Sequence, residues 1–236
     1  PLAAKFDTVG PLWRTGEDCT LMLAALEGGK AADLRGASVK HMRFGALQTV
    51  ALEDVRDAPL KAYEDALTRL SDAGAEIVPF EAPELTEAMP LSGILYTAEA
   101  YGLWGDTIEA APEKMFAPIL ERFRSGKEFC AADYVAAWTK LETLRATWGP
   151  RTAGFDAVLA PTAPNLPPDR DRLMTDDEYY VTENLLALRN TRIGNLMGLC
   201  GVTLPTNTPS CGVMLLGAPY AEEQLLRVAS AAESVL

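Results

Sequence analysis

The sequence has a single histidine and lacks several familiar catalytic patterns. A Ser-His-Asp or Cys-His arrangement would have to use His41, which stands in the stretch GASVKHMRFG close to Lys40 and Arg43. We predict that His41 is a solvated or packed strand residue instead. The nucleophile-elbow pattern G-x-S-x-G, a Walker loop, G-x-G-x-x-G and H-E-x-x-H are all missing. No residue of this chain is therefore assigned a catalytic role.

Cysteines are few and far apart. With no C-x-x-C pair and no cluster of histidines, the spacing argues against a disulfide framework and against a zinc site. We expect reduced thiols, a cytoplasmic protein, and neither a metal nor another cofactor. The four cysteines are Cys19, Cys130, Cys200 and Cys211.

Positive charge is also scarce. Lys and Arg total 21 against 33 Asp and Glu, which gives a net charge of −12. Nucleic acids and anionic membranes attract an excess of basic residues, so neither is expected as a partner. No apolar run approaches the roughly 18 residues of a membrane span, and the N-terminus does not resemble a signal peptide. The chain begins at Pro1 without an initiator Met, so we expect a fragment of a longer protein.

The patterns that are present predict an α/β fold. The chain has 236 residues, of which 48% are hydrophobic, enough for a sizeable core. Alternation around Val39–Phe44 suggests a strand, Pro59–Ala73 is an amphipathic helix pattern ending at Gly74, and AEIVPFEAP reads as a second strand. A strand, a helix and a strand joined in this way predict a parallel pair with a crossover helix.

Further elements follow from local patterns. Residues 84–149 are mostly helical in pattern, and FDAVLA at 155–160 is typical of a buried parallel strand that ends in the proline-rich loop PTAPNLPPDRDR. Residues 15–27 predict a helix that starts in a capping box, ends at Gly28 and has Cys19, Met22, Leu23 and Leu26 on one apolar face. Residues 220–235 predict a final helix. Acidic runs such as 176–178 are interpreted as solvated charge.

One apolar stretch carries unexpected polar residues. Within NTRIGNLMGLCGVTLP, the residues Asn190, Thr191, Arg192 and Asn195 recur at near-helical spacing beside small glycines. Two interpretations stay open: asparagine amides that satisfy buried backbone groups, and side chains that contact a substrate.

Four blocks of the sequence, in the correct order, resemble the amidase signature family. They are FDTVGPLWRTGEDCTLMLAALEG, FDAVLAPTAPNLPP, NTRIGNLMGLCGVTLPT and GVMLLGAPYAEEQLLRVASAAE. The resemblance implies α/β/α layers around a mixed sheet. It also implies that residues 1–236 are the C-terminal portion of a single amidase domain with a helix-rich insertion at about 84–149.

The resemblance further implies amide hydrolysis or transfer by a serine, a cis-serine and a lysine. In relatives these three residues lie in a Gly- and Ser-rich segment upstream of the FDTVGP block, so the chain alone is expected to be inactive. In relatives the segment matching 191–195 lies beside the acyl group. It makes Thr191 and Arg192 the expected substrate-binding residues, with Asn195 holding the loop.

Other functions remain as alternatives. The chain can be the A component of a glutamine-dependent tRNA amidotransferase, although such components tend to carry an acidic residue near the position of Leu188. It can also be a non-catalytic subunit or remnant that binds a separate N-terminal piece or a small ligand. A self-sufficient binding domain would not leave a large apolar surface uncovered. The expected partners are a small-molecule amide and the missing N-terminal segment, with a homodimer left open.

Overall fold

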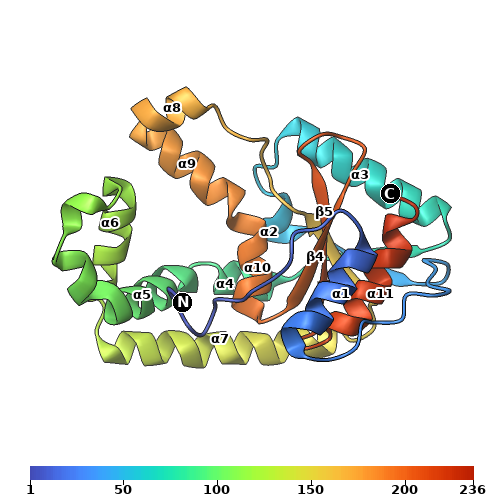
Figure 1. Cartoon of the computed structure of the whole chain (residues 1–236), viewed down its shortest axis with the longest axis horizontal. Helices are drawn as coiled ribbons and strands as arrows, with labels where there is room; N and C mark the ends of the chain where they lie inside the picture. Colours follow the sequence, from blue (N-terminus) through green and yellow to red (C-terminus); the bar gives the residue numbers. More distant parts are fainter.

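A computed structural model describes residues 1–236 as a five-stranded sheet between helices (Figure 1). The strands are β1 (Arg43–Leu47), β2 (Glu76–Phe80), β3 (Ala157–Pro161), β4 (Cys200–Pro205) and β5 (Gly212–Gly217). The α-helices are α1 (Gly16–Glu27), α2 (Thr49–Leu52), α3 (Asp57–Asp72), α4 (Pro83–Ala88), α5 (Leu91–Glu109), α6 (Ala117–Arg124), α7 (Ala131–Thr152), α8 (Arg170–Thr175), α9 (Asp177–Ala187), α10 (Arg189–Met197) and α11 (Glu222–Glu233). Two short 3₁₀ helices, η1 (Pro112–Lys114) and η2 (Ser125–Glu128), flank α6.

The sheet is mixed, with the strand order β2-β1-β3-β5-β4. Strand β1 pairs in parallel with β2 and with β3, whereas β5 is antiparallel to both β3 and β4. The predicted parallel pair with its crossover helix is confirmed as β1, α3 and β2. Strand β4 has β5 as its one strand neighbour, so its other edge is unpaired.

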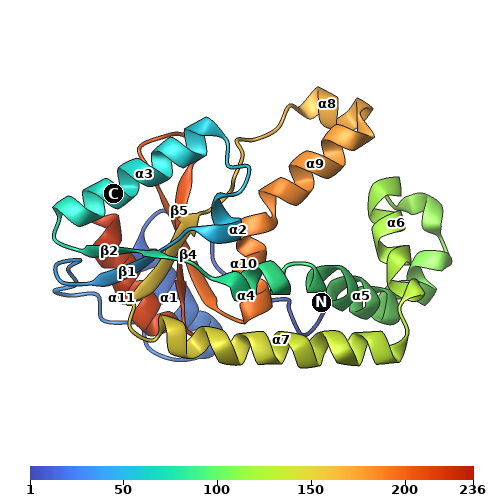
Figure 2. The same cartoon turned by 180° about the vertical axis from the view of Figure 1, so that it is seen from behind.

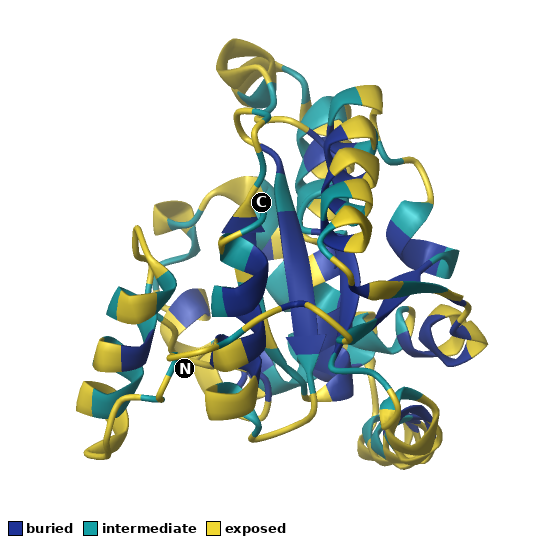
Figure 3. Ribbon diagram, turned by 90° about the vertical axis from the view of Figure 1, so that its right-hand side faces the viewer, coloured by how far each residue is buried: buried dark blue, intermediate teal, exposed yellow.

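Helices cover both faces of the sheet and give three layers (Figure 2). Alternate residues of each strand point to opposite faces, so Val158 of β3 belongs to one hydrophobic core and Leu159 to the other. The first core contains residues of α2, α4, α5, α7 and α10, and the second contains residues of α3 and α11. Figure 3 shows the buried strands inside helices whose outer sides are exposed. The expected α/β/α arrangement is confirmed.

The stretch 84–149 is helical, as its pattern predicts, and α5, α6 and most of α7 project to one side of the sheet together with α8 and α9 (Figures 1 and 2). A glycine makes one close contact there possible: a Cβ at Gly126 would lie 2.0 Å from the Thr97 backbone oxygen. That this stretch is an insertion stays a prediction. None of the helices combines the length and the apolarity that a membrane crossing requires.

Two local predictions are corrected by the structure. His41 is an exposed turn residue with a φ of 70°, and the strand begins only at Arg43. The His41 backbone N–H donates to Gly74 O, and Met42 N–H donates to Val39 O. In the N-terminal helix, the capping hydroxyl of Thr15 and the left-handed Gly28 are as expected, but Leu26 on the predicted apolar face is 54% exposed.

Candidate functional site

The polar stretch singled out in the sequence forms α10, which packs against the sheet. Its C-terminal cap is Gly198, whose φ of 70° is left-handed and therefore suits glycine. A Cβ at Gly194 would lie 3.0 Å from a Leu216 methyl group on β5, so a larger residue would require the Leu216 side chain to shift. The glycines allow a close helix-to-sheet contact that brings the polar side chains of α10 against neighbouring backbone.

Asn190 is a structural residue. Its side chain is completely buried, and its Nδ2 donates to Ala51 O at 3.0 Å and to Pro161 O at 2.7 Å. These bonds tie α10 to the end of α2 and to the carboxyl end of β3. The preceding Arg189 also donates to Ala51 O, at 3.2 Å. The Ala51 carbonyl near the end of α2 therefore accepts hydrogen bonds from two side chains of α10.

Asn195 holds the N-terminal segment. Its Nδ2 donates to Phe6 O at 2.8 Å, and the Phe6 ring stacks on Trp138 with centroids 5.0 Å apart and meets Tyr96 edge-on at 4.6 Å. Aromatic contacts of this kind anchor a segment through burial and ring geometry. The structural role expected for Asn195 fits this geometry, and the same residue lines a cavity.

Thr191 is exposed on the outer side of α10. Its hydroxyl donates to Leu188 O at 3.2 Å, a bond within its own chain segment. No other side chain of the chain forms a hydrogen bond with it. Its role in substrate binding therefore stays a prediction.

A cavity of about 230 Å³ lies between the N-terminal segment, α5, α6 and α10. Tyr96, Arg122 and Asn195 supply polar groups to it, and Phe6 supplies apolar surface. Asp7 also lines the cavity, but its carboxylate accepts backbone N–H groups from Leu2 and Ala3. The wall of the cavity therefore combines donors from Tyr96, Arg122 and Asn195 with one carboxylate, that of Asp7.

Arg192 stands three residues before Asn195 on α10 and is partly buried, but it is not one of the residues that line the cavity. Burial lowers the pKa of the Arg192 guanidinium, and repulsion from the Arg122 guanidinium adds to this effect. Burial raises the pKa of the Tyr96 phenol, and its Oη is buried without a hydrogen-bond partner. Arg192 forms neither an ion pair nor a side-chain hydrogen bond, whereas Arg122 donates to Asn184 Oδ1 at 3.1 Å.

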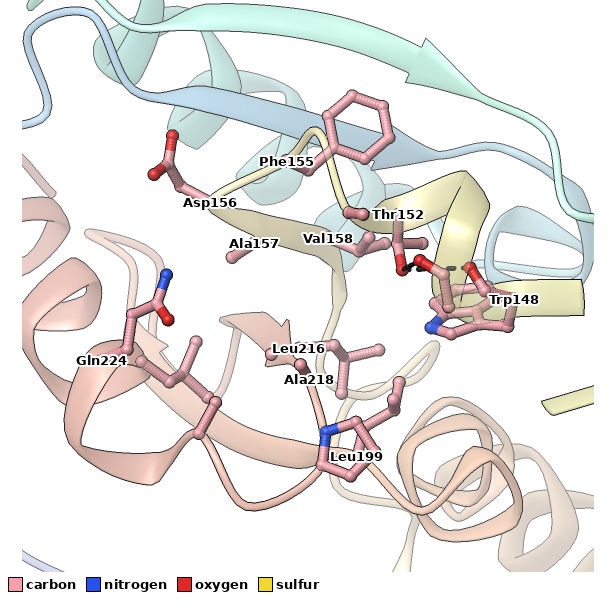
Figure 4. Close-up of a pocket in the computed structure, with 16 residues that line it drawn as sticks. Trp148, Thr152, Phe155, Asp156, Ala157, Val158, Leu199, Leu216, Ala218 and Gln224 are labelled. Atoms are coloured by element: carbon pink, nitrogen blue, oxygen red, sulfur yellow. Dashed lines mark hydrogen bonds between the residues drawn. The ribbon is translucent and has the colours of Figure 1, made fainter. Parts of the chain in front are cut away.

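A second cavity, of about 250 Å³, lies between α7, α11 and the ends of β3 and β5 (Figure 4). Two of its polar groups are already engaged: the Thr152 hydroxyl donates to Trp148 O and Gly149 O, and Asp156 Oδ2 accepts the Arg43 N–H at 2.7 Å. The exposed Gln224 amide on α11 forms no hydrogen bond. The remaining lining is mainly apolar, including Val158 and Leu216. The first cavity is therefore the better candidate for a site that binds a polar ligand.

The structure places Asn195 in the wall of the first cavity, leaves Arg192 partly buried outside that wall, and leaves Thr191 exposed on the outer side of α10. Sequence reasoning missed Tyr96 and Arg122. Both stand in long helical stretches with no distinctive motif, and only the folding of α5 and α6 beside α10 makes them neighbours of Arg192.

Comparisons with known proteins point to one family. The family model described as Amidase matches residues 1–226. The 2-amino-5-chloromuconic acid deaminase of Comamonas testosteroni is 30% identical over 244 residues, covering 100% of this chain and 53% of that protein. The A component of the glutamyl-tRNA(Gln) amidotransferase of Bartonella bacilliformis is 26% identical, covering 96% of this chain and 54% of that protein.

The fold is shared with solved structures as well. A crystal structure of an amidase superposes with a TM-score of 0.82 at 22% identity, covering 100% of this chain and 54% of that chain. The chain thus spans about half the length of the relatives that it matches.

Proposed function

Because the chain belongs to the amidase family, we propose that it is the C-terminal part of an enzyme that hydrolyses a carboxamide to a carboxylate and ammonia or an amine. The observation that carries the proposal is the family match over residues 1–226, together with the donor-rich cavity beside α10. The 236 residues are then one portion of a single amidase domain, with residues 84–149 as a helix-rich insertion.

The chemistry is assigned to residues outside these 236. A serine attacks the amide carbonyl, a lysine acting through a cis-serine takes the serine proton and passes a proton to the leaving nitrogen, and the C–N bond breaks. Water then releases the acyl group as a carboxylate. Removing nucleophile, base and oxyanion donors together lowers the rate by about 10⁶-fold or more, so residues 1–236 alone should be inactive.

The role of residues 1–236 is to form one wall of the substrate site. Arg192 contacts the acyl part of the amide, and Thr191 lies at its outer side. Asn195 orients the wall by holding the N-terminal segment through Phe6. Asn190 fixes α10 to the carboxyl end of β3, where it supports the wall without contacting the substrate.

The uncovered surface supports a further segment in the intact protein. Strand β4 has an unpaired edge, and unpaired edges readily accept another strand. Several large apolar side chains near the N-terminus and the start of α11 are exposed, including Val9 at 86%, Leu12 at 97% and Tyr220 at 96%. A binding domain sufficient in itself would bury more of this surface, which favours the enzyme over the alternative of a non-catalytic remnant.

The A component of a tRNA amidotransferase is the second enzymatic candidate, because relatives with that name align over nearly the whole chain. Leu188, which is 46% exposed, stands near the position where such proteins tend to carry an acidic residue. A hydrophobic side chain cannot pair with a substrate amine there, so we favour hydrolysis of a small amide. The expected partners are that amide and the segment with the triad, a homodimer remains open, and the four unpaired cysteines favour a cytoplasmic location.

Ammonia release from a panel of small amides tests the proposal. The intact protein should turn over at least one amide, while residues 1–236 alone should show none above the uncatalysed rate. Replacing the serine nucleophile of the intact protein with alanine is the matched control. Absence of turnover by the intact protein on every amide would contradict the proposed activity, and turnover by residues 1–236 alone would contradict the assignment of the triad.

A further inference from the structure

We propose that the cavity between α7, α11 and the ends of β3 and β5 binds a small alkylammonium ion, with the cationic head at Asp156 and the alkyl chain against the apolar wall. This inference goes beyond the proposed function and does not rest on it. Asp156 directly precedes β3, whereas Asn190 of α10 contacts Pro161 O at the other end of that strand. The strand is roughly 13 Å long, so this cavity is separate from the proposed substrate wall.

One carboxylate of this cavity lacks a cation. Asp156 is the single charged residue of the lining, which contains no Lys, Arg or His. Its Oδ2 accepts the Arg43 N–H, but its Oδ1 forms no hydrogen bond, and Asp156 takes part in none of the ion pairs of the chain. The Arg43 guanidinium is engaged elsewhere, because its Nε pairs with Glu76 at 3.2 Å. One carboxylate oxygen therefore remains to accept a donor from a ligand.

Two neighbouring groups add to the attraction for a cation. Gly149 and Ala153 line the cavity at the C-terminal end of α7, a helix of 22 residues. The carbonyls at such an end carry partial negative charge, which favours cations. The Gln224 amide on α11 forms no hydrogen bond, so its oxygen can accept one from an ammonium group. The positive end of α11 is offset by Glu222 and Glu223 in its first turn.

The rest of the cavity suits an alkyl chain. Asp156 and Gln224 lie on one side of it and Trp148 on the opposite side, with Val158 and Leu216 between them (Figure 4). Each methylene that this wall removes from water should tighten binding by about 4-fold. At about 250 Å³ the cavity is smaller than the roughly 300–1,000 Å³ of sites for drug-sized ligands, so a chain of a few carbons fits better than a long one.

Calorimetric titration of the intact protein with three probes tests the site. Butylammonium carries both the charge and the chain, 1-butanol keeps the chain without the charge, and ethylammonium keeps the charge with two fewer methylenes. The Kd of butylammonium should be about 10-fold or more below that of either other probe, because 1-butanol lacks the charge-assisted bond and ethylammonium buries less apolar surface. No binding of butylammonium, or equal affinity for it and either other probe, would overturn the proposal.

Variants of the polar end test where the ion binds. Asp156→Asn removes the charge but keeps an oxygen that can accept the Arg43 N–H, so the fold should be retained. It should raise the Kd of butylammonium by about 10-fold and leave that of 1-butanol within about 2-fold. Gln224→Leu, at an exposed position, should raise the Kd of butylammonium by about 3-fold. Asp65→Asn is the matched control, because Asp65 on α3 is exposed and pairs with Lys61, and it should leave the Kd unchanged.

Two results of the variant titrations would contradict the site. If Asp156→Asn and Asp65→Asn weaken butylammonium binding equally, the ion responds to the net negative charge of the chain rather than to this cavity. If Asp156→Asn binds butylammonium as tightly as the wild type, the carboxylate is not the partner of the ion. The readout is binding, so a protein that hydrolyses no amide but binds butylammonium through Asp156 would disprove the proposed activity and leave this site standing.

Discussion

Two groups of arginines in this molecule behave in opposite ways. On the sheet side of α7, Arg151 pairs with Glu84, whose side chain is only 3% exposed, and near the proline-rich loop Arg56 pairs with the buried Glu183 at 3.0 Å. Around α10, Arg122 and Arg192 have no acidic partner. The first group completes its charge balance within the chain, and the second, of which Arg122 lines the cavity, does not. Loss of an arginine that pairs with a buried carboxylate should cost stability, whereas loss of an unpaired arginine should cost little.

The largest effect on stability is expected from breaking an ion pair of the first group. Arg151→Met should lower the free energy of unfolding of the intact protein by about 3 kcal/mol, because it leaves the Glu84 carboxylate buried without its cation. Denaturant unfolding measures this loss. Lys61→Met is the control, since Lys61 and Asp65 are both exposed and their pair should contribute less than about 0.5 kcal/mol. Equal effects of the two variants would contradict the distinction.

Asn190→Leu tests a neutral side chain whose hydrogen bonds are likewise made within the chain. It should lower the free energy of unfolding by about 2 kcal/mol, because the carbonyls of Ala51 and Pro161 each lose a buried donor. Thr191→Ala, one residue along the same helix and exposed, should change it by less than about 0.5 kcal/mol. A small effect at Asn190 would mean that α10 is not fixed by this amide.

Asn195→Ala should have a smaller and more local effect. The loss of its bond to Phe6 O at 2.8 Å should lower the free energy of unfolding by about 1 kcal/mol. Limited proteolysis should show faster cleavage within residues 1–15, because this bond helps to anchor the segment that carries Phe6. Unchanged cleavage would indicate that the aromatic contacts of Phe6 hold the segment alone.

Arg192→Met should have the smallest effect on stability. Without ligand, the free energy of unfolding should stay within about 1 kcal/mol of the wild type or rise, because the substitution removes a partly buried charge that has no carboxylate partner. Denaturant unfolding of the ligand-free intact protein measures it. A loss as large as that of Arg151→Met would place Arg192 in the first group and contradict the comparison.

Much of the fold follows from local sequence patterns. The amphipathic helix at 57–72 and the fully buried β3 are recognisable because burial on one face or on both leaves a clear periodicity. The predicted strand around His41 was placed too early. The backbone turns at His41, which has a left-handed conformation, and the alternation of apolar residues does not reveal such a turn.

The site was less predictable than the fold. The asparagines of α10 stood out because amides are rare in an apolar stretch. Asn190 is buried in backbone contacts, as the structural interpretation expects, whereas substrate contact by Arg192 stays a prediction. Tyr96 and Arg122 could not be predicted, since only the folded chain brings α5, α6 and Asn195 of α10 to the wall of one cavity.

The most direct test is a structure of the intact protein, with its serine nucleophile replaced by alanine and an amide substrate bound. The account predicts that the acyl part of the amide lies against α10 and that its carbonyl carbon faces the replaced serine, which comes from outside residues 1–236. An amide bound instead between α7 and α11 would contradict the assignment of this side of α10 to the substrate site.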